Sequence, residues 1–160
     1  MAKTSGGSHM TVHVSADAKE KIKAALKTGL RQVGMQAESN AKALCPFDTG
    51  LLRNSITFAI GGETAHISSY AADNGDGSGS YEGSAPADAD GTMTLYLGSN
   101  VQYAPYVELG HHQQPGRYVP AIGKRLVNEY VAAKPFLRPA IENYAEQYNQ
   151  ILISALNAIK

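Results

Sequence analysis

Cys45 is the residue of this sequence best suited to nucleophilic chemistry, because a thiolate is an intrinsically strong nucleophile. Such a thiolate needs an activating base beside it, and no histidine stands near Cys45, which directly precedes a proline. The chain also has neither a nucleophile-elbow serine nor a phosphate-cradling glycine motif. A single cysteine excludes an internal disulfide framework as well. We therefore expect an incidental thiol and no enzymatic activity.

Two stretches have residue types that bind metals. His111 and His112 are adjacent, so their side chains point in different directions, and no cysteine or aspartate cluster is near them in sequence. Residues 73–77 (DNGDG) resemble the start of a calcium loop, but a glycine occupies one of the positions that must supply an oxygen. His66 falls on the polar side of a predicted strand. We therefore expect surface histidines, no metal and no cofactor.

The charges are balanced overall but segregated along the chain. Lys and Arg together number 14, as do Asp and Glu, yet no Lys or Arg stands between Arg53 and Arg117. Four cations follow one another at steps of four residues: Lys19, Lys23, Lys27 and Arg31. This pattern indicates either a solvated helix face or a contact surface for an acidic partner or DNA. The zero net charge lacks the basic excess typical of nucleic-acid-binding proteins.

The positions of these residues depend first on a long N-terminal helix. Residues 1–10 read as an expression-tag remnant, and residues 11–160 have the length of one domain. Ser15 is a good N-cap, and apolar residues recur at helical spacing from there until Pro46 ends the helix. Two internal glycines, at 29 and 34, would each weaken it by about 1 kcal/mol unless close packing needs them. No apolar run is long enough to predict a membrane span.

Strand patterns follow the helix. Asp48 is expected to cap a short helical segment at 49–54. Alternating apolar residues predict a hairpin of strands 55–60 and 64–70. The segment 71–92 is rich in Gly, Ser, Asp and Ala and has few apolar residues, so we expect a mobile acidic insertion. A further strand is predicted at 93–101.

The C-terminal third predicts a helical turn, an arm and a second long helix. Residues 103–110 suit a short turn of helix, with Pro105 in its first turn and Gly110 at a left-handed end. Residues 118–134 predict a short strand or an irregular arm. An apolar stripe at helical spacing begins at Pro139, and Arg138 should avoid helical geometry because it precedes a proline. These elements predict an α+β domain with two long amphipathic helices packed on one face of a small antiparallel sheet of three to four strands.

Three sequence blocks stand in a fixed order: residues 48–56 (DTGLLRNSI), 103–110 (YAPYVELG) and 135–141 (PFLRPAI). Together they resemble the minor tail or neck proteins of long-tailed phages and prophages, a family described as tail-completion, tail-component or head–tail joining proteins. The resemblance runs from about Ala18 to the C-terminus. The segments 71–92 and 118–134 are longer than the family pattern needs, which marks them as candidate assembly loops of this member.

This resemblance implies a structural virion protein of the tail or neck, present in the host cytoplasm during assembly, without cofactor and without a membrane partner. It implies a homo-oligomeric ring, which we expect to be a hexamer, at the head-proximal end of the tail, in contact with other neck, connector or tail-tube proteins. The basic helix face would then meet a neighbour's acidic segment or DNA passing through the ring. The alternative function is a small nucleic-acid-binding module that uses the same face.

Most residues of the three blocks are expected to be packing residues. We expect Arg53 and Arg138 to pair with Glu108, since an arginine fork on a half-buried carboxylate would hold the turn in place. The expected packing residues are Asp48, Thr49, Gly50, Leu52, Arg53, Ser55, Tyr103, Pro105, Tyr106, Glu108, Gly110, Pro135, Phe136, Leu137, Arg138 and Pro139.

Overall fold

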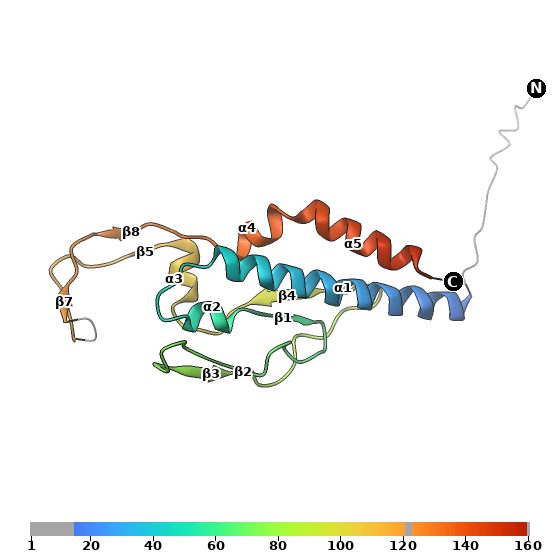
Figure 1. Cartoon of the computed structure of the whole chain (residues 1–160), viewed down its shortest axis with the longest axis horizontal. Helices are drawn as coiled ribbons and strands as arrows, with labels where there is room; N and C mark the ends of the chain where they lie inside the picture. The colour runs from blue at the N-terminus through green and yellow to red at the C-terminus, as the bar shows by residue number, and fades with distance from the viewer. Residues whose placement is uncertain (1–14, 121–122, 160) are drawn as a thin grey trace, which may run out of the picture.

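The long helix α1 (Ala16–Leu44) extends along the whole body of the molecule, as the sequence predicted (Figure 1). The computed structural model describes residues 15–120 and 123–159, so the interpretation of residues 1–10 as a tag lies outside it. The Ser15 side chain accepts the backbone N–H of Ala18, which confirms the predicted N-cap. The helix ends at Cys45, whose backbone is extended because Pro46 follows it.

The C-terminal helix is divided into α4 (Leu137–Glu142) and α5 (Ala145–Asn157), which pack along α1 (Figure 1). The prediction of one continuous helix from Pro139 was therefore wrong. At the break, the Ala140 carbonyl accepts the Tyr148 hydroxyl at 2.6 Å, whereas a continuous helix would give it the Tyr144 N–H. Arg138 and Pro139 lie inside α4, so the expectation that Arg138 would avoid helical geometry was also wrong. A proline is tolerated there because the first-turn N–H groups have no partner within a helix.

The central sheet pairs β1 (Thr57–Ile60) with β4 (Leu95–Gly98) in antiparallel register, with Phe58 opposite Leu97. The predicted hairpin of residues 55–60 with 64–70 was wrong. The tight turn does form, since Glu63 N–H donates to the Ile60 carbonyl at 2.8 Å. Beyond His66, however, the Ile67 N–H donates to the Thr57 side chain rather than to a strand backbone, so the chain leaves β1.

Residues 69–80 instead form a separate hairpin of β2 (Ser69–Ala71) and β3 (Ser78–Ser80). The Tyr81 hydroxyl ties the following residues to the body, because it donates to the Ser55 carbonyl at 2.6 Å and accepts the Asn100 N–H at 3.0 Å. Tyr81 thus anchors the acidic segment 71–92 to the body. The mobility of the segment in solution stays a prediction.

An extended arm leaves the body after the short helix α3 (Ala104–Leu109) and returns before α4 (Figure 1). Two antiparallel ladders hold it together, β5 (His111–His112) with β8 (Tyr130–Val131) and β6 (Tyr118–Val119) with β7 (Lys124–Arg125). Within the described residues, all four sheets are two-stranded. The α+β class is thus confirmed, but the expected single sheet of three to four strands was wrong.

The core lies on both sides of α1, which contacts α4 and α5 as well as β1 and β4. One buried cluster joins the end of α1 to the helix α2 (Leu51–Ser55), α3 and α4, with Phe136 and Ile56 fully buried at its centre. A second cluster surrounds Tyr148 of α5. Gly34 has a packing role here, because a Cβ at that position would lie 2.3 Å from the Phe58 ring.

Candidate assembly interface

Glu108 connects the second sequence block to the third. Its carboxylate accepts three backbone N–H groups at the start of α4, from Phe136 at 2.7 Å and from Leu137 and Arg138 at 3.0 Å each. Burial of this carboxyl opposes ionisation, but the three backbone N–H donors outweigh it and the pKa of Glu108 is lowered. The expected ion pairs of Glu108 with the Arg53 and Arg138 side chains were wrong, since these side chains contact Asp73 and Glu142 instead. Glu108 caps a helix, because unpaired N–H groups at a helix start attract a carboxylate.

Arg53 pairs with the acidic segment rather than with Glu108. Its guanidinium lies 2.8 Å from the Asp73 carboxylate and stacks over the Phe47 ring at 4.6 Å. Asn54 donates to the same carboxylate at 2.7 Å. Gly50 has a φ of +81°, and a Cβ there would lie 2.5 Å from Asp73, so this turn needs glycine for two reasons. The first block therefore clamps the start of the segment 71–92.

The remaining block residues divide between interior and surface. Leu52, Ser55 and Phe136 are buried, and Leu137 packs half-buried against them. Tyr103 and Tyr106 were expected to be packing residues, but their side chains are 41% and 57% exposed. A further set has mainly backbone roles or lies at the surface. Asp48 is exposed, and the expected Asp48 cap of α2 was wrong, because the N-cap residue is Gly50. The Thr49 carbonyl accepts the Asp73 N–H. Pro105 lies in the first turn of α3, Pro135 is exposed and Pro139 lies in α4.

Gly110 lies where the arm leaves the body. Its φ is +74°, and a Cβ there would lie 2.7 Å from the Val131 carbonyl oxygen and 2.5 Å from the Tyr130 hydroxyl. The glycine thus lets the outgoing and returning strands of the arm approach each other closely. Its backbone conformation is not the left-handed helix end that we expected. The Lys134 N–H donates to the Val107 carbonyl at 2.8 Å and closes the base of the arm.

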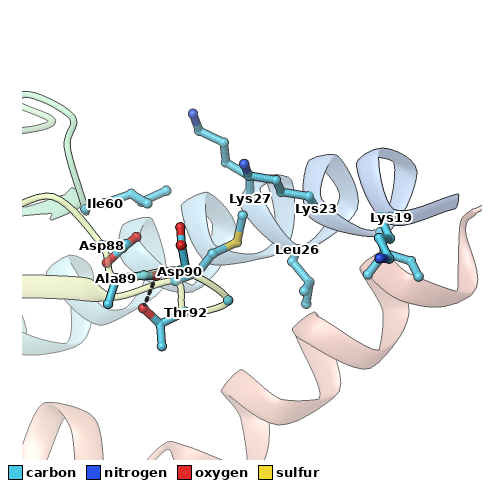
Figure 2. Close-up of a pocket in the computed structure, with 13 residues that line it drawn as sticks. Lys19, Lys23, Leu26, Lys27, Ile60, Asp88, Ala89, Asp90 and Thr92 are labelled. Atoms are coloured by element: carbon cyan, nitrogen blue, oxygen red, sulfur yellow. Dashed lines mark hydrogen bonds between the residues drawn. The ribbon is translucent and has the colours of Figure 1, made fainter. Parts of the chain in front are cut away.

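The basic face of α1 is partly engaged within the chain. Lys27 and Arg31 both contact the Glu63 carboxylate, at 2.6 and 2.8 Å. The Lys27 ammonium is the main cause that lowers the pKa of Glu63, and Arg31 adds to it. Lys19 and Lys23 line a groove of about 560 Å³ whose other wall includes residues 88–92 with Asp88 and Asp90 (Figure 2). Basic helix and acidic segment therefore already face each other in one subunit.

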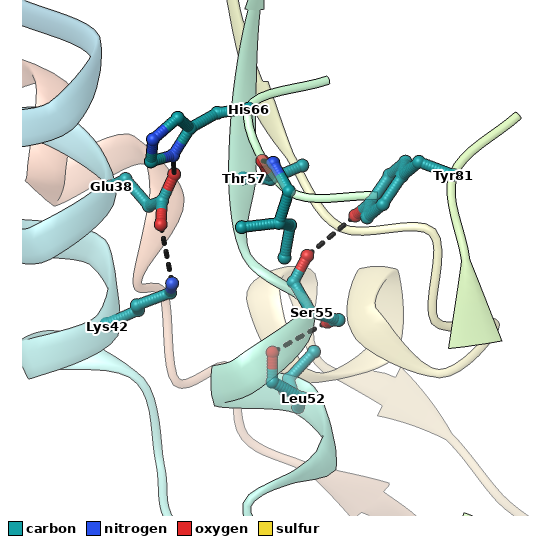
Figure 3. Close-up of polar contacts among 8 residues, drawn as sticks. Glu38, Lys42, Leu52, Ser55, Thr57, His66 and Tyr81 are labelled. Atoms are coloured by element: carbon teal, nitrogen blue, oxygen red, sulfur yellow. Dashed lines mark hydrogen bonds and ion pairs between the residues drawn. The ribbon is translucent and has the colours of Figure 1, made fainter. Parts of the chain in front are cut away.

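A polar cluster between α1 and β1 was missed by the sequence reasoning (Figure 3). Glu38 is 7% exposed and lies 2.9 Å from the His66 ring and beside the Lys42 ammonium. The His66 ring also stacks on Phe58 with centroids 4.8 Å apart. The spacing of Glu38 and Lys42 could have suggested their pair. Nothing in the sequence pointed to His66, because residues 28 positions apart meet only through the fold.

Neither metal binding nor membrane spanning finds support in the described ranges. No group of three or more His, Cys, Asp and Glu side chains in residues 15–120 and 123–159 is placed to hold a metal ion. His111 and His112 lie at the base of the arm, beside Tyr106 and Tyr130 respectively. None of the helices in that part of the chain combines the length and apolar character that crossing a bilayer requires.

The family comparison agrees with the sequence blocks. The chain is a phage tail component by family. Residues 11–110 match the HK97-gp10-like family model, described as "Bacteriophage HK97-gp10, putative tail-component", and because this is most of the chain, the protein belongs to that family. The match includes the first two blocks and ends at Gly110, so the arm, α4 and α5 lie beyond it. No curated protein and no solved structure matched the chain.

Proposed function

We propose that this tail component is a structural neck or tail-completion protein. It assembles as a homo-oligomeric ring, for which we expect six subunits, at the head-proximal end of the tail. There it joins the tail to the head or connector, and it has no catalytic role. Family membership supports the tail location, and the projecting arm is the observation that carries the assembly role. Such a protein is assembled in the host cytoplasm and remains in the virion.

The arm supports assembly because its apolar side chains lack a covering surface in the described chain. Val127 is 82% exposed, Tyr118 is 52% exposed and Tyr130 is 48% exposed. Exposed apolar side chains gathered on one projection are typical of a protein–protein contact. A monomer would gain nothing from ordering such an arm, whereas a ring subunit would bury it against a neighbour or a connector protein.

The structure offers no support for the alternative function, a small nucleic-acid-binding module. Glu63 pairs with both Lys27 and Arg31 and so lowers their net positive charge, and Asp88 and Asp90 lie across the groove from Lys19 and Lys23. A DNA-binding face would instead present several uncompensated cations to the phosphates. Contact of Lys19 and Lys23 with DNA that passes through the ring remains part of the proposal. Strong, salt-dependent DNA binding by the isolated protein would favour the alternative instead.

Native mass spectrometry and negative-stain microscopy of the purified chain test the ring directly. We expect a single oligomer of fixed subunit number with a central opening. A chain that stays monomeric at every concentration, alone and with purified tails, would contradict the proposal.

An assembly assay tests the joining role. Phage production without this protein should accumulate separate heads and tails, and the purified protein should restore joined particles. Lys19→Glu with Lys23→Glu probes the basic helix face in the same assay, with Lys21→Glu on the same helix as the control. Joined particles in the absence of the protein would refute the head–tail joining role while leaving the tail family membership intact.

A further inference from the structure

The arm carries an excess of positive charge. Residues 111–134 contain four cations and one acid. Arg125 donates to the Gly116 carbonyl at 2.6 Å and so stiffens the arm. Arg117 and Lys124 are exposed, and neither forms an ion pair with another part of the described chain. Together with exposed Tyr118 they give the arm a surface that is both apolar and positively charged.

The segment 76–90 has the opposite character. It contains four acids and no cation. Asp76, Glu82 and Asp90 are exposed, and within the described residues none of them forms an ion pair. This differs from Asp73 and Glu63, which are held by Arg53 and by the cations of α1. Among the described residues these three acids therefore form no ion pair of their own, although Asp90 lies across a groove from Lys19 and Lys23.

Grooves adjoin the acidic segment. One, of about 290 Å³, is lined by Glu82 together with Tyr96 and Phe58 of the β1–β4 sheet. Tyr96 is 39% exposed there, so an apolar side chain entering this groove would meet an aromatic ring. The larger groove beside Asp88 and Asp90 has Ile22, Leu26 and Met93 in its walls. Acidic side chains beside apolar walls complement an arm that carries cations beside a tyrosine and a valine.

The two surfaces lie far apart in one subunit. The arm projects from the end where α3 and α4 meet, whereas Asp88 and Asp90 lie beside the first half of α1 (Figures 1 and 2). The base of the arm is fixed by the hydrogen bond from the Lys134 N–H to the Val107 carbonyl and by the close approach of the two strands at Gly110. These complementary charges are held apart within one chain, but they can meet between copies.

We infer that the arm of one subunit docks on residues 82–90, within the acidic segment of the next copy. Two different surfaces meet in such a contact, so it is head-to-tail, and head-to-tail contacts close into rings when the rotation allows. Arg117 and Lys124 face Glu82 and Asp90 of the neighbour, while Tyr118 and Val127 enter the grooves beside them. The inference rests on the proposed ring and specifies the contact that builds it.

A charge exchange tests this contact. The arm variant carries Arg117→Glu and Lys124→Glu, and the segment variant carries Glu82→Lys and Asp90→Lys. Each should self-associate at least about tenfold more weakly than the unaltered chain, because like charges would face each other. When the two variants are mixed, every arm again faces a segment of opposite charge. The mixture should therefore regain oligomers with equal numbers of both variants, as measured by native mass spectrometry.

The controls separate this inference from the ring itself. Lys21→Glu with Glu142→Lys exchanges exposed helix charges elsewhere and should leave assembly unchanged, and circular dichroism should show every variant folded. If the unaltered chain forms rings and the arm and segment variants do so equally well, the contact is refuted while the ring stands. Weakened variants that do not recover on mixing also refute the pairing. A monomeric unaltered chain refutes the ring and the contact together.

Discussion

Glu108 accepts the backbone N–H of Phe136 at 2.7 Å, so a residue just before the arm caps the helix that begins just after it. The Phe136 side chain is fully buried in the core below this bond. The arm between the two residues is thereby closed at its base by a carboxylate and anchored by an aromatic ring. Its direction relative to the body depends on this junction together with the bond from Lys134 to Val107.

Glu108→Gln should therefore destabilise the protein. The amide keeps one oxygen but turns an NH₂ group toward backbone donors, so at least one N–H of α4 loses its acceptor. We expect a loss of about 1–3 kcal/mol in the free energy of unfolding, measured by chemical denaturation. The exposed Glu142→Gln in the same helix is the matched control and should have little effect. Equal stability of the two variants would show that the cap contributes nothing.

The contribution of Glu108 should also depend on pH in a defined direction. Its pKa is lowered from the ordinary value of 4.5, because the backbone N–H donors outweigh the effect of burial. A lowered folded-state pKa gives stability that is complete above the unfolded-state pKa and is lost as pH falls through the folded-state pKa. The stability difference between the unaltered chain and Glu108→Gln should shrink below pH 4.5. A difference that grew on acidification would contradict the assignment.

Gly50→Ala should be more damaging than a glycine replacement at a comparable turn. Both Gly50 and Gly62 have positive φ, +81° and +77°, so alanine should cost about 1–2 kcal/mol at either. Only at Gly50 would the new Cβ meet the Asp73 carboxylate, and only there would it disturb the pair with Arg53. Urea denaturation of both variants should show the larger loss for Gly50→Ala, and equal losses would argue against the clamp.

Gly34→Ala should destabilise α1 although alanine is the better helix former. The added Cβ would lie 2.3 Å from the Phe58 ring, which would force the helix and β1 apart. Overpacking of this kind typically costs about 1–3 kcal/mol. Ser39→Ala, at an exposed position of the same helix, is the control and should be neutral or stabilising. A thermally more stable Gly34→Ala protein would show that this close contact is absent.

Cys45 should be unreactive while the protein is folded. Burial raises the pKa of its thiol to about 11, with Arg53 opposing and Glu108 assisting the shift. At pH 8 only about one thiol in a thousand would then be ionised, and the thiolate is the reactive form. Iodoacetamide should label Cys45 slowly in the native protein and rapidly in denaturant, as followed by mass spectrometry. Fast labelling of the native protein would contradict the buried position.

Elements with strong local signals could be predicted from the sequence. The first helix has its Ser15 cap, its apolar spacing and the Pro46 stop within one continuous stretch, and α3 has its proline and glycine at either end. The three blocks were sufficient to indicate the tail-component family, which the family comparison confirmed. For the two helices the determining residues are neighbours in the chain, so propensity and capping do not depend on distant contacts.

Only the tertiary structure decided which distant groups meet. The partner of β1 is β4 rather than the nearest strand candidate, because Leu95 and Leu97 also pack against the clusters around α1. The Glu108 carboxylate accepts backbone N–H groups rather than an arginine side chain, because the first N–H groups of α4 lie next to it in the fold. Strand pairing and carboxylate partners depend on contacts across long sequence separations. Residue types alone leave several such partners open, and the packed core selects one.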